Sequence, residues 1–227
     1  MISKLRSKFE KYSTRQNALQ QVRENGFWFV DIPRTSSSSI KAELGLHFGP
    51  AYGKANLIET EYATKQWLND HVPAREMRTM IGKKYWQDLY TFTFVRNPYD
   101  RIASLYHYLR KRSEIPREWS FSEFVRRLLN ANKKTEYFRF HGLRYGAADF
   151  VLGKDGTVLV ENIFKYENRS DGIRQIADKL GLKEFGECHV QGASPVGQNY
   201  RIMYDDQTRE LVSQRFATDL KLFDYRF

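Results

Sequence analysis

Apolar positions along the chain alternate between short continuous runs and stripes with helical spacing. Residues 27–32 (FWFVDI) and 91–95 (TFTFV) are short and rich in β-forming residues, which is typical of buried strands. Residues 149–166 predict further short strands, with a turn at 154–156 (KDG) between the first two. The pattern therefore predicts strands in three parts of the chain.

Between these runs, apolar residues recur at i, i+3, i+4 and i+7, the spacing of one helix face. One helix should begin near Pro98 with Asn97 as its cap, and shorter helices are expected at 60–69 and 73–80. The stripes are Ile102, Leu105, Tyr106 and Leu109; Phe121, Phe124, Val125, Leu128 and Leu129 after a Ser120 cap; Ile173, Ile176, Ala177 and Leu180 before a Gly181 stop; and Val212, Phe216, Leu220 and Phe223 in a final helix from about Asp205.

Strands that alternate with helices indicate an α/β fold with a central, mainly parallel sheet flanked by helices. We expect residues 1–25 to form a polar helical lead-in and residues 26–227 to form a single domain. The chain has 227 residues, of which 41% are hydrophobic, enough for one such domain with a substantial core.

The sequence carries no obvious signal for export or membrane insertion. The longest unbroken apolar run, residues 27–30, is far shorter than the roughly 20 residues that cross a bilayer, and residues 1–25 contain no apolar signal-peptide core. The single cysteine, Cys188, cannot form an internal disulfide. These features predict a bacterial-type cytoplasmic protein without a transmembrane segment.

A formal net charge of +10 predicts an affinity for anions, such as nucleotides, acidic glycans or nucleic acid. Charge alone does not choose among them. A non-enzymatic module that binds RNA or DNA is one alternative, but Lys and Arg are spread over every segment and no nucleic-acid-binding motif occurs.

The first segment with chemical content is IPRTSSSSIK, residues 32–41. A strand that stops at Pro33 and turns through small hydroxyl residues into a helix exposes several backbone N–H groups at one place. The positive end of the helix dipole lies there too, so the segment predicts an anion cradle. Arg34 would add a full positive charge, and the hydroxyls of Thr35 and of Ser36, Ser37, Ser38 and Ser39 would add donors.

The second segment is TFTFVRNPYDRIASLYHYL, residues 91–109. Arg96 ends a strand, at the carboxyl edge where open α/β sheets bind ligands. Ser104 follows eight residues later in the helix, so Arg96 and Ser104 can converge on one anion. The phosphate loop GxxxxGK[ST] is absent, which disfavours an atypical nucleotide-dependent kinase.

Together the two segments resemble those of the sulfotransferases that use 3′-phosphoadenosine-5′-phosphosulfate (PAPS). IPRTSSSSI is similar to the 5′-phosphosulfate loop of the carbohydrate (glycan) branch, PKTGSTS or PKTASTS, with Arg34 and Ser36 at the usual Lys and Gly or Ala positions. FVRNPYDRIASLY is similar to the family's 3′-phosphate motif. Residues 164–182 and 205–227 resemble later segments of the same branch. The resemblance implies a P-loop-like sulfotransferase fold.

The resemblance also implies site residues and reactants. Residues 35–39 would hold the phosphosulfate, Arg34 would offset charge on the leaving phosphate, and Arg96 with Ser104 would bind the 3′-phosphate. Arg201, in the loop 192–201, would close over the nucleotide. The products would be a sulfated acceptor, a carbohydrate or glycolipid hydroxyl, and 3′,5′-adenosine bisphosphate. No metal and no nucleic-acid partner are expected.

A general base must take the proton of the acceptor hydroxyl, because a neutral alcohol is a poor nucleophile. His71 resembles the position where glycan 2-O-sulfotransferases carry their base. The alternatives are His47, Glu59, Glu61 and Asp70.

Overall fold

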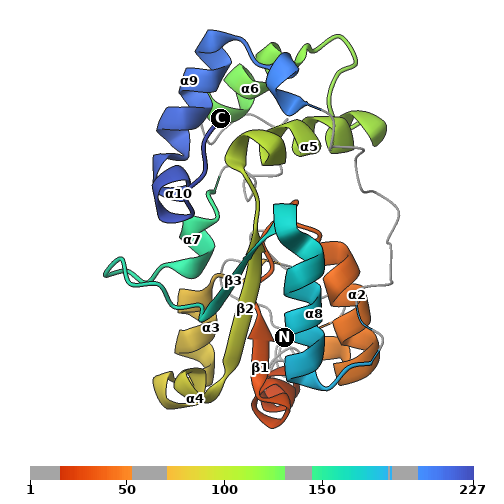
Figure 1. Ribbon diagram of the computed structural model, residues 1–227, viewed down its shortest axis with the longest axis vertical. Coiled ribbons are helices and arrows are strands. Elements are labelled where there is room, and N and C mark those ends of the chain that lie inside the picture. Colours follow the sequence, from red (N-terminus) through yellow and green to blue (C-terminus); the bar gives the residue numbers. More distant parts are fainter. Residues whose placement is uncertain (1–15, 53–70, 131–144, 184, 186–198) are drawn as a thin grey trace, which may run out of the picture.

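A computed structural model describes residues 16–52, 71–130, 145–183, 185 and 199–227 (Figure 1). Its sheet has three parallel strands in the order β1-β2-β3: β1 is Phe27–Phe29, β2 is Tyr90–Val95 and β3 is Asn162–Lys165. Phe27 pairs with Tyr90, and Thr93 pairs with Ile163. The predicted α/β class with a parallel sheet is confirmed.

Helices flank the sheet on both sides, and the side chains of β1 and most of β2 are buried on both faces. In Figure 1, α3 (Ala74–Ile81) and α4 (Lys83–Asp88) lie to the left of the strands, and α2 (Ser37–Phe48) and α8 (Arg169–Leu180) lie to the right. Phe27, Phe92 and Phe94 are fully buried between them. The helix over residues 16–25 packs Ala18, Leu19 and Val22 into the same core.

A second apolar cluster lies beyond the carboxyl ends of the strands (top of Figure 1). It is built by α5 (Pro98–Lys111), α6 (Phe121–Asn130) and α9 (Asp206–Arg215). The stripe predicted for α5 is buried in it, and so are the first four residues of the stripe predicted for α6. The expected caps are present too, since Asn97 accepts from Tyr99 N and Ser120 accepts from Glu123 N.

Two expectations about local structure were wrong in part, although the turn at 154–156 and a strand within 149–166 are present. Residues Ala148–Val151 form a helical turn, α7, and the following turn carries a single antiparallel bridge, Leu152 with Val158, before β3. The last helix is two helices, because α9 ends at Arg215 and α10 (Ala217–Leu222) begins after the single residue Phe216. The bend lets Asp219 accept hydrogen bonds from the N–H groups of Ala147 and Ala148 at the start of α7.

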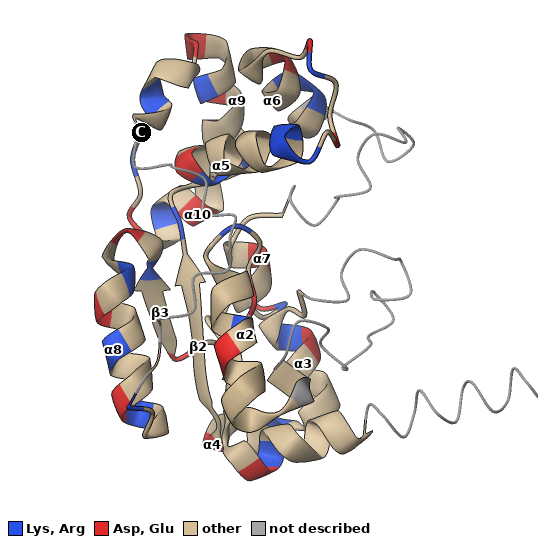
Figure 2. Cartoon of the chain, turned by 90° about the vertical axis from the view of Figure 1, so that its right-hand side faces the viewer, with Lys and Arg blue, Asp and Glu red and all other residues tan. Residues whose placement is uncertain are grey.

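The remaining elements are short 3₁₀ turns: η1 (Pro50–Tyr52), η4 (Tyr166–Asn168) and η5 (Tyr200–Met203). Within the described residues, every helix is too short or too polar to span a membrane. Figure 2 shows Lys and Arg on helices of both apolar clusters, interspersed with Asp and Glu, so the excess positive charge is not gathered on one element.

Candidate functional site

The junction between β1 and α2 has an unusual backbone. Arg34 and Ser36 both have positive φ, 69° and 72°, although neither is a glycine. Such residues cost on the order of 1–3 kcal/mol each and persist only where the surrounding structure holds them. Ser36 is the N-cap residue of α2, but its side chain makes no capping hydrogen bond. The junction thus leaves the first turn of α2 without a side-chain cap.

The hydroxyl groups predicted for this junction differ in their surroundings. The Thr35 hydroxyl is fully buried and donates to the carbonyl of Ile32 at 2.8 Å, so it holds the turn itself. Ser37 is buried, whereas Ser38 is exposed on the first turn of α2. Ser39 N–H returns to the carbonyl of Ser36 at 3.2 Å. The backbone and the exposed Ser38 are therefore the donors best placed to meet a ligand.

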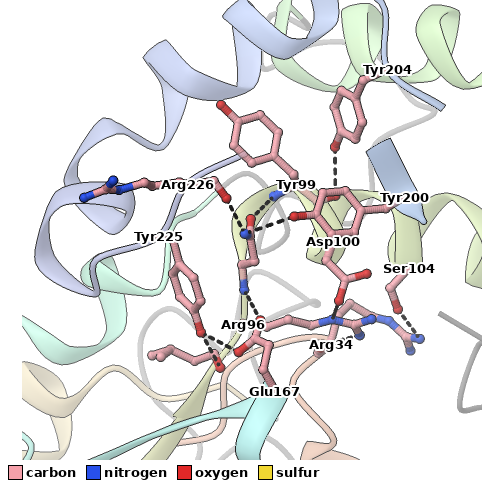
Figure 3. A network of polar contacts seen from close by, with 12 residues as sticks. Arg34, Arg96, Tyr99, Asp100, Ser104, Glu167, Tyr200, Tyr204, Tyr225 and Arg226 are labelled. Atoms are coloured by element: carbon pink, nitrogen blue, oxygen red, sulfur yellow. Dashed lines mark hydrogen bonds and ion pairs between the residues drawn. The ribbon is translucent and has the colours of Figure 1, made fainter. Parts of the chain in front are cut away.

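The junction between β2 and α5 presents Arg96, which is 4% exposed. Its Nε donates to Asp100 Oδ2 at 2.7 Å, and its Nη1 donates to the carbonyl of Arg34 at 3.2 Å (Figure 3). The guanidinium also stacks on the Tyr166 ring at 4.2 Å. Among the described residues, no group accepts a hydrogen bond from Arg96 Nη2. Asp100 and the Arg34 carbonyl thus orient a buried cation that keeps one donor available.

Arg34 and Ser104 meet in this structure. Arg34 Nη2 donates to Ser104 Oγ at 3.1 Å, and the Arg34 guanidinium lies over the Tyr108 ring at 4.3 Å. Arg34 Nε has no acceptor among the described residues. Burial, and then the neighbouring charge of Arg96, lower the pKa of Arg34 below its usual value. Two adjacent guanidiniums with unused donors, beside an uncapped helix, form a site suited to an anion.

His71 lies beside the same junction. Its Nδ1 is 3.0 Å from Asp31 Oδ2 and 3.2 Å from the carbonyl oxygen of Asp31, two residues before Pro33. Of the alternative bases, His47 is exposed in the last turn of α2, roughly 15 Å along the helix from Ser37 at 1.5 Å per residue. Glu59, Glu61 and Asp70 lie outside the described residues.

Arg201 is exposed on η5, and its guanidinium lies over the rings of Tyr200 and Phe227, at 4.8 and 5.9 Å. Its described contacts do not reach Arg34, Arg96 or Ser104. Most of the loop predicted to close over a nucleotide, residues 192–198, lies outside the described residues.

The C-terminal residues brace the end of β2. Tyr225 Oη donates to the carbonyl of Val95 and to Glu167 Oε2, and Glu167 Oε1 accepts from the N–H of Asn97 (Figure 3). The Asn97 side chain in turn donates to the carbonyl of Arg226 at 2.8 Å. These contacts hold the strand end that carries Arg96.

Sequence reasoning missed several members of this site. Asp100 stands four residues after Arg96, a spacing at which helical side chains pair, so it was within reach of the pattern. Asp31, Tyr108 and Tyr166 carry no such signal, because each meets its partner only through the tertiary fold.

The chain is similar to known proteins. The family model described as "Sulfotransferase family" matches residues 19–226. A 134-residue stretch is 31% identical to an uncharacterised protein of Archaeoglobus fulgidus, over 57% of this chain and 98% of that protein. A sulfotransferase from Alicyclobacillus acidocaldarius of known crystal structure is 15% identical, with a TM-score of 0.38 over 94% of this chain and 93% of its own. The family match spans nearly the whole described fold and both junctions, and the chain belongs to the sulfotransferase family.

Proposed function

We propose that this sulfotransferase moves a sulfuryl group from PAPS to a hydroxyl of a carbohydrate or glycolipid acceptor. One observation carries the proposal: Arg34, Arg96 and Ser104 converge beside the uncapped start of α2, with guanidinium donors that no described residue uses. PAPS carries phosphate groups at two separate ends, and each end needs an anion site. The two junctions offer two adjacent groups of hydrogen-bond donors.

In this proposal each of the two junctions binds one end of PAPS. The first turn of α2 and the Ser38 hydroxyl hold the 5′-phosphosulfate, and Arg34 offsets negative charge as it develops on the phosphate oxygen that leaves sulfur. Arg96 and Ser104 hold the 3′-phosphate, the group that distinguishes this donor from AMP and ATP. The Arg34–Ser104 hydrogen bond joins the two halves, so binding of one phosphate would affect the other.

His71 is the proposed general base. It takes the proton from the acceptor hydroxyl as the new O–S bond forms and the bond from sulfur to the phosphate oxygen breaks. The products are a sulfate ester and 3′,5′-adenosine bisphosphate. The position of His71 next to the β1–α2 junction supports this role, since the reacting sulfur would lie at that junction.

The acceptor class is proposed from the resemblance to the carbohydrate branch and from the net charge of +10. Lys and Arg positions on helices of both clusters (Figure 2) suit an acidic glycan or glycolipid approaching from several directions.

Calorimetric titration with 3′,5′-adenosine bisphosphate, in the absence of magnesium, tests the donor assignment. AMP and ATP serve as controls, because both lack the 3′-phosphate. Micromolar binding of the bisphosphate, with at least tenfold weaker binding of the controls, is the expected result. A second titration, with magnesium present, would contradict the proposal and favour a kinase if ATP bound more tightly than the bisphosphate.

Transfer assays with PAPS then test the reaction itself. Neutral sugars, acidic glycans and glycolipids form the acceptor panel, and release of the bisphosphate is the common readout. We expect acceptor-dependent release with a carbohydrate or glycolipid, and release with none of them would remove the acceptor assignment.

A further inference from the structure

Asp31 is a buried carboxylate that the proposed chemistry has not used. It follows β1 by two residues, is 1% exposed, and lies three residues before Arg34. Its Oδ2 is 2.6 Å from Lys41 Nζ on α2 and 3.0 Å from His71 Nδ1. A buried carboxylate is costly unless it is paired, so its place between Lys41 and His71 calls for an explanation.

The surroundings of His71 Nδ1 fix the position of one proton. Both oxygens near this nitrogen, Asp31 Oδ2 at 3.0 Å and the Asp31 carbonyl at 3.2 Å, are hydrogen-bond acceptors. A neutral imidazole has one N–H donor and one bare nitrogen, and a bare nitrogen facing two acceptors would be repelled. Nδ1 therefore carries the hydrogen, which leaves Nε2 as the nitrogen with a free lone pair.

Asp31 remains an acceptor because it remains ionised. Burial would raise its pKa, but its interactions with His71 and Lys41 lower the pKa well below its usual range. The Lys41 ammonium is itself buried, at 5% exposure, so it cannot move away into solvent. Lys41 thus keeps Asp31 charged and in place.

We propose that Asp31 is a positioning residue for the reaction: it holds His71 with hydrogen on Nδ1 and so presents Nε2 as the base. This inference rests on the proposed function for the role of His71. As Nε2 takes the proton of the acceptor hydroxyl, the ring becomes a cation, and the carboxylate at Nδ1 stabilises that charge. The same logic operates in Ser-His-Asp triads, where the carboxylate sets the tautomer without taking the proton.

A purely structural role for Asp31 would predict a different arrangement. A carboxylate needed only as the partner of Lys41 would have no reason to lie 3.0 Å from His71 Nδ1 as well. The site of the pair also matters, because Asp31 belongs to the short segment that continues into the positive-φ residues Arg34 and Ser36. The carboxylate therefore fixes His71 relative to the anion-binding junction.

The tautomer can be measured without turnover. Long-range ¹H–¹⁵N spectra of the full chain at about pH 8, where free imidazole side chains are neutral, distinguish protonated from bare ring nitrogens. His71→Gln identifies the signal of His71. We expect hydrogen on Nδ1 in the parent protein and a larger share of the Nε2–H tautomer in Asp31→Ala, where only the backbone carbonyl of residue 31 still accepts from Nδ1. An unchanged Nδ1–H signal in Asp31→Ala would overturn the inference.

Kinetics test the consequence of that tautomer. Asp31→Ala should lower kcat by about 10²-fold or more while KM for PAPS and the affinity for the bisphosphate change by less than about threefold. In a His71→Ala background the same substitution should lower kcat by less than about threefold, because the group it positions is gone. An equal loss in both backgrounds would make Asp31 a structural residue.

Removal of Asp31 alone deprives the buried Lys41 of its carboxylate and can destabilise the fold. The paired variant Asp31→Ala/Lys41→Met removes both charges, and thermal unfolding checks that it folds. It should show the same loss of kcat and the same larger share of the Nε2–H tautomer. Asp206→Asn, a substitution on a fully exposed side chain of α9, is the matched control and should leave both readouts unchanged.

The outcomes separate this inference from the proposed function. A parent protein that binds no bisphosphate and transfers no sulfuryl group contradicts the proposed function, and the tautomer spectra still decide whether Asp31 positions His71. A parent protein that turns over, with Asp31→Ala at full kcat, contradicts this inference alone.

Discussion

The two strand-to-helix junctions of this protein lie side by side but are built in opposite ways. Between β2 and α5, Asn97 caps the helix with its own side chain and Pro98 occupies the first turn. Between β1 and α2, Ser36 lies in the left-handed region and offers no side-chain cap. One helix start has a side-chain cap, and among the described residues the other has none.

This difference determines what each junction can contribute to binding. The first N–H groups of any helix lack partners within the helix. At the β2–α5 junction the Asn97 side chain accepts from the N–H of Tyr99, and the group left for an anion is a side chain, the Arg96 guanidinium. Where no side chain occupies these N–H groups, the backbone itself remains for the ligand, and Arg34 adds charge. The two phosphate subsites that we propose would thus be made from one kind of supersecondary unit.

We call the uncapped β1–α2 junction the open junction and the capped β2–α5 junction the closed junction. The largest expected effect comes from Arg34 at the open junction. Arg34→Ala should lower kcat for sulfuryl transfer by about 10²–10³-fold, as for removal of a donor that stabilises charge in the transition state. Binding of the bisphosphate should be partly retained. The exposed Arg174→Ala on α8 serves as control, and turnover equal to that of the parent protein would remove Arg34 from the mechanism.

Arg96 at the closed junction should act on affinity. Arg96→Ala should weaken binding of 3′,5′-adenosine bisphosphate by about 1.5–3 kcal/mol in calorimetry, the range for a charge-assisted hydrogen bond. AMP, which lacks the 3′-phosphate, should lose less. Equal losses for both nucleotides would mean that Arg96 acts through the Arg34 carbonyl that it holds.

Loss of the cap at the closed junction should affect stability. Asn97→Ala should lower the free energy of unfolding by at least about 1 kcal/mol in urea denaturation, because the cap bond to Tyr99 N and the bond to the Arg226 carbonyl both disappear. Ser36→Ala, at the cap that makes no such bond, should change it by less than about 0.5 kcal/mol. Similar losses in both variants would erase the contrast between the junctions.

The smallest expected effect is a gain at the open junction. Ser36→Gly should raise the free energy of unfolding by about 0.5 kcal/mol, because relief of the positive φ, worth roughly 1–2 kcal/mol, exceeds the entropy cost of glycine. Ser38→Gly, in the helical first turn of α2, should instead lower it by about 0.5–1 kcal/mol. A loss in both variants would show that the strain at Ser36 is negligible.

The closed junction could be read from the sequence because its signals are local. The apolar run of β2, Asn97, Pro98 and the stripe of α5 each depend on neighbours within a few residues, and all of them were predicted. The Arg96–Ser104 spacing is likewise local, since both residues flank or lie on one helix.

The open junction and the base could be predicted only in part. No glycine marks the positive φ at Arg34 or Ser36, so the sequence offers no sign of that backbone. The Asp31–Lys41–His71 cluster joins a strand end, a helix and a distant segment, and no spacing rule connects them. The break at Phe216 is hidden for the same reason, because the apolar stripe continues across it.

The brace by Tyr225 and Arg226 has a consequence for biosynthesis. Tyr225 meets the Val95 carbonyl across 130 residues of sequence. At 5–20 residues per second, a ribosome needs roughly 7–26 s to add that length. The end of β2, which carries Arg96, therefore lacks this support for that time after its own synthesis.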